Sequence, residues 1–319
     1  MTVGDVRVTV VICTHNRAEL LTGALRSVLN QSYPNEWYEV LVIDNASTDN
    51  TTDVVQEVMN SFRSPSIRLA HEPVPGIGNA RNAGVEAARG EIIGFTDDDA
   101  IVDYNWVAHA VACFESIKYR VAAVGGQVIP RYDVEPPGWF PKDSEADFRG
   151  ERGRIMRRGE FPSGNNMFIW KNAILRAGGF QNLGMTESAM GYGEETALFQ
   201  RLMDLDESVR FYYSPDVVIE HIIPQYKTTA GYMFKRALMS GVYESRGADQ
   251  LSIPQRLTDA FIVAGRVMIR TLVALPMSIL NVQRPGDWLV KYVVPLLWEC
   301  GRLMRLLGYI PRLRQRPAS

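Results

Sequence analysis

The first hundred residues alternate between short apolar runs and segments of helical spacing, and this alternation constrains the fold more than any other feature of the chain. Val8–Cys13 is a continuous, mostly β-branched run, which is typical of a parallel strand buried on both faces. Helical patterns separate it from three further strand-like segments, at Val40–Ile43, Ile67–Leu69 and Glu91–Phe95. A repeat of strand and helix predicts a parallel sheet with right-handed crossovers and helices on its faces.

Polar side chains stand where these predicted strands end. His15 and Asn16 follow the first strand, Asp44 follows the second, and Asp97–Asp99 follow the fourth. In open α/β sheets, ligands bind beyond the carboxyl ends of the strands. We therefore expect a functional site at this edge of the sheet.

The three consecutive acids favour a metal site. Asp97 and Asp99 are two residues apart on what reads as an extended segment, so their side chains should leave the same face. Close carboxylates raise each other's pKa unless a cation neutralises them, and Mg²⁺ or Mn²⁺ would do so with water or substrate phosphate as further ligands. His221, just past an apolar strand, is a candidate additional ligand. The alternative is a solvated acidic turn in which Asp99 caps the next helix.

Two other segments carry candidate site residues. PGIGNARNAG resembles a dinucleotide-binding glycine loop but has Arg81 in place of the third glycine. We interpret it as a turn into a helix that brings Arg81 near the sheet edge, either to contact a base or phosphate or to form a surface salt bridge. GYGEETALFQRL places Glu194 and Glu195 in the first turn of a helix, where they either complement the helix dipole or present a general base.

Composition excludes several classes of protein. The formal net charge of −2 over 319 residues argues against nucleic acid as a partner. The three cysteines are too scattered for a disulfide framework or a metal cluster, and the N-terminus does not read as a secretory signal. The longest uncharged run near the C-terminus, Thr271–Gln283, is too short to span a membrane. We expect a cytoplasmic protein.

The final segment raises the question of membrane contact. Seven basic and two acidic residues lie between Arg284 and Ser319, interleaved with apolar ones. One interpretation is an amphipathic helix on an anionic membrane surface, which would make the protein peripheral on the cytoplasmic face. The other is a helix packed on the catalytic domain with a basic, solvated face.

Together these segments resemble the family 2 glycosyltransferases, which have the GT-A fold. The likeness covers about residues 7–225 and follows the order of the family's motifs. It is carried by TVVICTHNRAELLTGALRSVLNQSYP, LVIDNASTDNT, GNARNAGVEAARGEIIGFTDDDA, PSGNNMFIWKNAILRAGGF and GYGEETALFQRL. The last resembles the family's E-D-x-x-L-x-x-R-L motif, with Glu-Glu in place of Glu-Asp.

The resemblance implies an α/β protein with a Rossmann-like, mostly parallel central sheet flanked by helices and a C-terminal helical appendage. We expect a catalytic domain at residues 1–226, with a nucleotide-binding half at 1–100 and an acceptor-binding half at 101–226. Residues 131–162, rich in proline and without clean periodicity, would form a loop or lid. A C-terminal helical region would occupy residues 227–319.

The resemblance also implies the ligands and the site. The donor would be a nucleotide-sugar, with uridine as the family expectation, the metal Mn²⁺ or Mg²⁺, and the acceptor a hydroxyl of a saccharide or a lipid-linked molecule. The implied nucleotide contacts are Thr14, Asn16, Asp44 and Arg81, with Asp97 and Asp98 near the ribose and metal, and the implied metal ligand is Asp99.

The acceptor side of the implied site is less sharply defined. Glu195 falls where the family has its catalytic Asp, so the resemblance makes it the general base of an inverting transfer. Because this chain has Glu-Glu, the choice between Glu194 and Glu195 stays open. Asn165, Asn166 and Trp139 would lie near the sugar or acceptor.

Two alternatives remain at this stage. One is a protein that binds nucleotide-sugars without transferring them. The other is a phosphatase of the haloacid-dehalogenase type, which also uses D-x-D after a strand but places it on the first strand.

Overall fold

The computed structural model describes residues 6–117, 121–142, 151–181, 193–244, 251–280 and 288–308. The chain divides into two compact units. The first comprises Met1–Arg131, Glu145–Thr186 and Glu194–Ile222, and the second comprises Tyr132–Ser144, Glu187–Gly193 and Ile223–Ser319.

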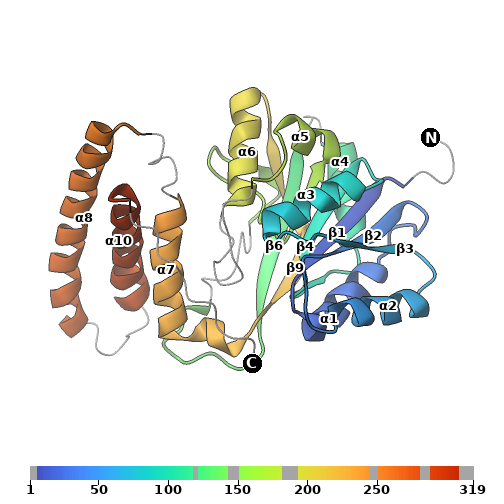
Figure 1. Ribbon diagram of the computed structural model, residues 1–319, viewed down its shortest axis with the longest axis horizontal. Coiled ribbons are helices and arrows are strands. Elements are labelled where there is room, and N and C mark those ends of the chain that lie inside the picture. The colour runs from blue at the N-terminus through green and yellow to red at the C-terminus, as the bar shows by residue number, and fades with distance from the viewer. Residues whose placement is uncertain are drawn as a thin grey trace. The chain divides into compact units, whose positions relative to one another are not determined.

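A nine-stranded sheet organises the described part of the first unit (Figure 1). Its order is β3-β2-β1-β4-β8-β6-β9-β5, with β7 paired to β9. Strands β1 to β4 pair in parallel, whereas β8 runs antiparallel to both β4 and β6. The strands are β1 (Val8–Thr14), β2 (Tyr38–Asp44), β3 (Ser66–His71), β4 (Ile92–Asp97), β5 (Ala100–Val102), β6 (Ala123–Tyr132), β7 (Arg154–Ile155), β8 (Met167–Trp170) and β9 (Phe211–Ile223).

Helices cover both faces of this sheet. Because side chains alternate along a strand, β1 contributes Val10 and Ile12 to one core and Val11 and Cys13 to the other. The first core includes residues of α1 (Ala18–Leu29), α2 (Thr51–Ser61) and α4 (Trp106–Ser116). The second includes residues of α3 (Ile77–Ala87), α5 (Lys171–Arg176) and α6 (Glu194–Leu205). The two-layer burial of the central strands explains their continuous apolar runs.

The predicted fold class is confirmed, and the four parallel strands lie where the sequence predicted them. Strand β9 contains a proline and is still one strand, whose pairings with β7 and β5 lie on either side of Pro215. Strand β6 was not predicted from the sequence, because it contains two glycines and a proline. A Cβ on Gly126 would lie 1.7 Å from the carbonyl oxygen of Val217, so the strands require glycine there.

The second unit is helical, as the sequence predicted for its C-terminal part. It contains α7 (Ala230–Glu244), α8 (Ile253–Leu280) and α10 (Val294–Leu306), with a 3₁₀ turn at Gln225–Thr228 and a π-helical turn at Leu289–Val293. Helix α10 lies between α7 and α8 and packs on both (Figure 1). In the described ranges, no helix combines the length and the apolar composition that crossing a membrane requires.

Candidate active site

The three acids occupy a tight turn at the sheet edge. Strand β4 ends at Asp97, a turn holds Asp98 and Asp99, and β5 begins at Ala100. This corrects two sequence-based arguments. The chain is not extended through the triplet, so the alternation rule does not relate Asp97 to Asp99, and Asp99 precedes a strand and therefore caps no helix.

The acids differ in their surroundings. The Asp97 side chain is 37% exposed, whereas Asp98 and Asp99 are buried. The Thr14 hydroxyl donates to Asp98 Oδ2 over 2.8 Å. Burial raises the pKa of Asp98 to about 7, in spite of the opposing charge of Arg17 and with the charge of Asp99 adding to the rise.

Asp99 meets His221 because β9 runs antiparallel to β5. His221 is the register partner of Ala100, and its Nε2 lies 3.3 Å from Asp99 Oδ1. On the other side, Arg17 Nη1 lies 3.5 Å from Asp99 Oδ2. A carboxylate oxygen suits Mn²⁺ or Mg²⁺, and the neighbouring imidazole extends the donor set to transition metals, so the pair can contribute to a divalent-cation site.

The full predicted metal set is not assembled as one cluster. Among the side chains that the structure describes, no group of three or more His, Cys, Asp and Glu residues is arranged as metal ligands. Asp97 instead lies 3.9 Å from Arg81 Nη2. The residues present fit a cation held by Asp99 and His221 and completed by other oxygen donors, and the metal itself stays a prediction.

Asn16 joins the loops after β1 and β2, and Asp44 shapes the second of these loops. Asn16 has a φ of 52° and its Oδ1 accepts hydrogen bonds from the backbone N–H groups of Thr48 and Asp49, at 2.7 and 3.3 Å. Asp44 Oδ1 accepts from the Ser47 N–H at 3.0 Å. Left-handed backbone at a non-glycine residue is uncommon and is concentrated at binding sites. Both predicted nucleotide residues are therefore at the sheet edge, where they fix the shape of these loops.

Asn45, the residue after Asp44, extends this network although it was assigned no role from the sequence. Its side chain donates to the carbonyl oxygens of Glu72 and Val74, at 3.0 and 2.8 Å, and accepts from the Gly76 N–H at 2.7 Å. Gly76 has a φ of 138°, which favours glycine. The N-terminus of α3 is thereby fastened to the end of β2.

Arg81 is buried, contrary to the surface salt bridge that the sequence left open. Its Nη1 donates to Glu194 Oε1 over 2.7 Å, and its Nη2 donates to the Gly164 carbonyl oxygen over 3.1 Å. The guanidinium also contacts the rings of Phe95 and Phe180, at 5.8 and 5.6 Å from their centroids. Burial lowers the pKa of Arg81, but the carboxylates of Glu194, Glu195 and Asp97 outweigh it and raise that pKa overall.

Glu195 is the more accessible member of the acidic pair. Its side chain is 21% exposed against 3% for Glu194, and its Oε2 lies 3.7 Å from Arg81 Nη1. In the part of the chain that the structure describes, the Oε2 atoms of both glutamates are buried without a hydrogen-bond partner. Burial and the neighbouring charge of Glu194 raise the pKa of Glu195 to about 7, in spite of Arg81.

Gly164 lies beside this pair and was not singled out from the sequence. A Cβ there would be 2.8 Å from Arg81 Nη2 and 3.3 Å from Glu195 Cδ. The segment PSGNN has the residues of a turn, so no local signal in the sequence marks the close approach of Gly164 to Arg81. The segment also holds Asn165, whose Oδ1 is buried without a partner among the described residues.

Asn166 has a structural role in the sheet. It is fully buried, accepts a hydrogen bond from Trp106 Nε1 at 2.8 Å and donates to the carbonyl oxygens of Gln127 and Val217, at 2.8 and 3.0 Å. These bonds use its side chain inside the sheet. This burial argues against the expectation that Asn166 lies near the acceptor.

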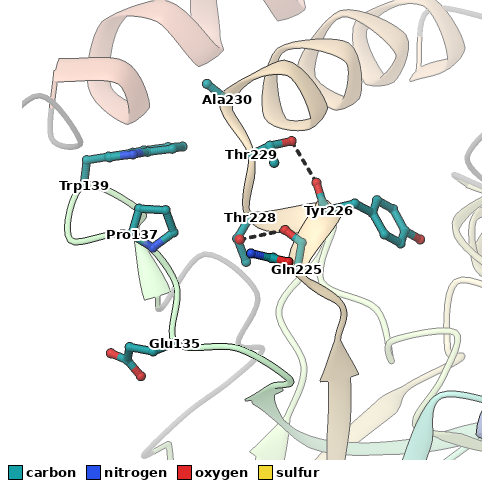
Figure 2. A pocket seen from close by; sticks show the side chains of 8 residues that line it. All are labelled: Glu135, Pro137, Trp139, Gln225, Tyr226, Thr228, Thr229 and Ala230. Atoms are coloured by element: carbon teal, nitrogen blue, oxygen red, sulfur yellow. Dashed lines mark hydrogen bonds between the residues drawn. The ribbon is translucent and has the colours of Figure 1, made fainter.

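A separate pocket of about 450 Å³ lies within the second unit. Figure 2 shows the rings of Trp139 and Pro137 on one side and the side chains of Gln225 and Thr229 on the other. The hydroxyl of Thr229 donates to the Tyr226 carbonyl oxygen at 2.8 Å. An indole opposite an amide is a combination that binds sugar rings by stacking and hydrogen bonding.

Comparison with known proteins defines the class. Residues 9–184 match Glycosyl transferase family 2, and the chain belongs to this family. Glycosyltransferase AglE of Haloferax volcanii is 28% identical over 204 residues, which are 64% of each chain. The glucosyl-dolichyl phosphate glucuronosyltransferase of the same organism is 26% identical over 79% of this chain and 80% of its own. The phosphatase alternative is wrong, because the family and the fold are those of glycosyltransferases.

Solved structures share the fold. The mannosyltransferase PcManGT from Pyrobaculum calidifontis, in complex with GDP-Man and Mn²⁺, superimposes with a TM-score of 0.66 at 19% identity, over 95% of this chain and 87% of its own. S. aureus TarS 1–349 in complex with UDP-GlcNAc gives a TM-score of 0.55 at 14% identity, over 96% and 93%. The fold is therefore GT-A.

Proposed function

We propose that this protein transfers a sugar from a nucleoside-diphosphate donor to a hydroxyl group of a saccharide or lipid-linked acceptor. Family membership supports the class of reaction. The name of one relative, a glucosyl-dolichyl phosphate glucuronosyltransferase, supports a lipid-linked acceptor. One structural neighbour holds GDP-Man and another UDP-GlcNAc, so both uridine and guanosine donors are candidates.

One observation carries the assignment of the base: the Glu195 side chain is 21% exposed, whereas Glu194 is 3% exposed and held by Arg81 at 2.7 Å. A carboxylate oxygen without a hydrogen bond is unfavourable unless a ligand supplies a donor, and an acceptor hydroxyl would do so. The raised pKa of Glu195 matches the task of removing a proton near neutral pH. Glu194 is already ion-paired with Arg81, which supports Glu195 as the base.

The stereochemistry follows from a single base. Glu195 takes the proton of the acceptor hydroxyl while that oxygen attacks the anomeric carbon on the face opposite the leaving diphosphate. One displacement inverts the configuration, by the same logic that applies to inverting glycosidases. Arg81 positions the base, because it contacts both glutamates and the Gly164 carbonyl oxygen. The predicted contact of Arg81 with the nucleotide stays a prediction.

The donor would bind at the carboxyl edge of β1, β2 and β4. Thr14, Asn16, Asp44 and Asp98 would form the nucleotide side of the pocket. Asp99 and His221, with the exposed carboxylate of Asp97, would hold the divalent cation. When bound, such a cation supplies positive charge that stabilises the leaving diphosphate.

The experiment that tests this proposal is a thermal-shift panel of UDP- and GDP-sugars with and without Mn²⁺. A ligand that binds only the folded state raises Tm, so the donor should give a shift that depends on the metal. Release of the nucleotide diphosphate on addition of an acceptor then separates a transferase from a protein that only binds the donor. A panel in which no nucleotide-sugar shifts Tm would contradict the proposal.

A further inference from the structure

Helix α8 exposes a broad apolar surface even though it belongs to a packed unit. Phe261 is 83% exposed and Leu257 is 60% exposed. Exposed apolar groups of this size normally mark a surface that is covered by something else. We call this surface the α8 face, and it consists of Ile253, Leu257, Phe261, Ile262, Met268, Ile269, Leu272 and Val273.

The spacing of these residues places them on one side of the helix. Leu257, Phe261, Met268 and Leu272 follow one another at intervals of four, seven and four residues, which is the repeat of one helical stripe. Ile262, Ile269 and Val273 repeat intervals of seven and four one position further on and widen it. From Ile253 to Val273 the α8 face is about 30 Å long at the rise of an α-helix.

The other side of α8 is the one that packs within the unit. Ala260 and Val263 form a small core with Leu306 of α10. Arg256 donates from Nε and Nη2 to the Leu306 carbonyl oxygen, at 3.2 and 3.0 Å. The α8 face therefore takes no part in the packing of α8 on α10 and stays exposed.

Helix α10 belongs to the segment for which the sequence left membrane contact open, and it is packed within the helical unit. A Cβ on Gly301 would lie 2.0 Å from the Leu238 carbonyl oxygen of α7, so α10 is in close contact with that helix. Glu299 is buried, with Arg266 and Arg302 at 3.9 and 3.5 Å. The described part of that segment thus packs on α7 and α8 of the helical unit, and residues 284–287 and 309–319 lie outside the described residues.

Charge indicates what covers the α8 face. Residues 223–319 contain 14 basic and five acidic residues, a net charge of +9, whereas residues 1–222 contain 20 and 31, a net charge of −11. Arg270 is exposed and lies beside the α8 face on the helical wheel, whereas the Arg266 side chain reaches toward Glu299 of α10. Two copies of so basic a region would repel each other, whereas an anionic lipid surface complements both the charge and the apolar stripe.

We propose that α8 lies in the interface of an anionic lipid bilayer, with the α8 face toward the acyl chains and Arg270 at the level of the headgroups. A long arginine side chain reaches the headgroups while the neighbouring apolar residues are immersed. This surface goes beyond the proposed transferase reaction and does not depend on it.

The test is flotation of the purified full-length protein with vesicles of phosphatidylcholine, with and without phosphatidylglycerol. The wild type should float with the anionic vesicles, and Phe261→Glu/Leu272→Glu should lower its partition coefficient by more than about tenfold, because each buried apolar side chain contributes roughly that factor. Arg270→Glu should weaken binding to anionic vesicles and flatten its salt dependence.

Matched controls come from the first unit. Leu175 and Leu205 are each 59% exposed, so Leu175→Glu/Leu205→Glu introduces the same change elsewhere and should leave binding unaltered. Arg26→Glu, on the exposed surface of α1, is the control for charge. Circular dichroism and Tm verify that each variant folds.

Two outcomes would overturn the proposal. In one, the wild type and the α8 double variant partition equally into anionic vesicles. In the other, the wild type is a dimer without lipid, the α8 double variant is a monomer, and neither binds vesicles, which would assign the α8 face to a second copy of the chain. Sedimentation velocity of both proteins distinguishes these results.

Discussion

Glu194 and Glu195 are adjacent and chemically identical, yet packing separates their properties. Glu194 is almost fully buried and forms a short ion pair with Arg81. Glu195 shares the same guanidinium at longer range, keeps part of its surface exposed and has its pKa raised. One carboxylate thus supports the arginine, and the other is left available to an incoming hydroxyl.

Replacing Glu195 by Gln should abolish transfer and leave donor binding intact. The amide keeps the shape of the side chain but does not accept a proton, so we expect kcat to fall by at least about 10³-fold. The measurement is nucleotide release with acceptor, beside the donor-induced shift in Tm. Unchanged turnover would remove Glu195 from the reaction, and loss of donor binding would indicate a structural role instead.

The raised pKa of Glu195 also predicts a dependence of stability on pH. A carboxyl group whose folded pKa lies above its unfolded value of about 4.5 holds a proton that the unfolded chain has lost. Its contribution is favourable at low pH and declines as the pH rises from about 4.5 to about 7. At pH 8, Glu195→Gln should therefore be more stable than the wild type by roughly 1–3 kcal/mol, with a smaller difference at pH 5. Urea denaturation of both proteins at the two pH values measures this, and equal differences at both would contradict it.

At the scale of elements, the close approach of two helix backbones explains why glycine occurs in the interior of α7 and of α10. The α7 and α10 helices each carry a glycine where they cross. A Cβ on Gly241 would lie 1.9 Å from the Trp298 carbonyl oxygen, and one on Gly301 would lie 2.0 Å from that of Leu238. Glycine is unfavourable in a helix interior by about 1 kcal/mol, so its presence at both positions reflects the crossing.

Gly301→Ala should destabilise the helical unit, because the added methyl group forces the two helices apart, at a cost of about 1–3 kcal/mol. Gly265, within α8, is the matched control, since nothing lies within 4 Å of its Cβ position. Gly265→Ala should stabilise the protein by up to about 1 kcal/mol through helix propensity alone. Thermal unfolding of the two variants compares them directly, and a rise of Tm in both would show that the crossing is not tight.

Element pairing also decides where His221 lies. In the sequence His221 follows an apolar run, and nothing local relates it to the acids more than a hundred residues earlier. The antiparallel pairing of β9 with β5 sets it opposite Ala100, next to Asp99. The resulting contact between His221 and Asp99 depends on the register in which β9 pairs with β5.

At the scale of the molecule, the unequal charge of the two parts of the chain bears on function. An excess of acid over residues 1–222 is unfavourable for binding an anionic diphosphate unless cations offset it, which supports a divalent metal beside Asp99. The basic excess over residues 223–319 favours an anionic surface. Donor chemistry and surface attachment would then belong to different parts of the chain.

The pocket at Trp139 lies within the second unit, and it is a candidate site for the acceptor. If the indole stacks on a ring of the acceptor, Trp139→Ala should raise the acceptor KM by about tenfold and leave the donor-induced shift in Tm unaltered. Trp37, which is 38% exposed in the first unit, is the matched control, and Trp37→Ala should change neither quantity. An unchanged acceptor KM in Trp139→Ala would exclude the pocket from acceptor binding.

The sequence by itself determined the parallel strands, the edge of the sheet at which the polar residues gather, and the family. These follow from hydrophobic period and from motifs, which are local properties of the chain. Only the tertiary structure decided that Arg81 is buried against Glu194, that Glu195 is left accessible, that a turn separates Asp97 from Asp99, and that α8 instead of α10 presents the apolar surface. Each of these depends on contacts between segments far apart in the chain, whose energies no single segment contains.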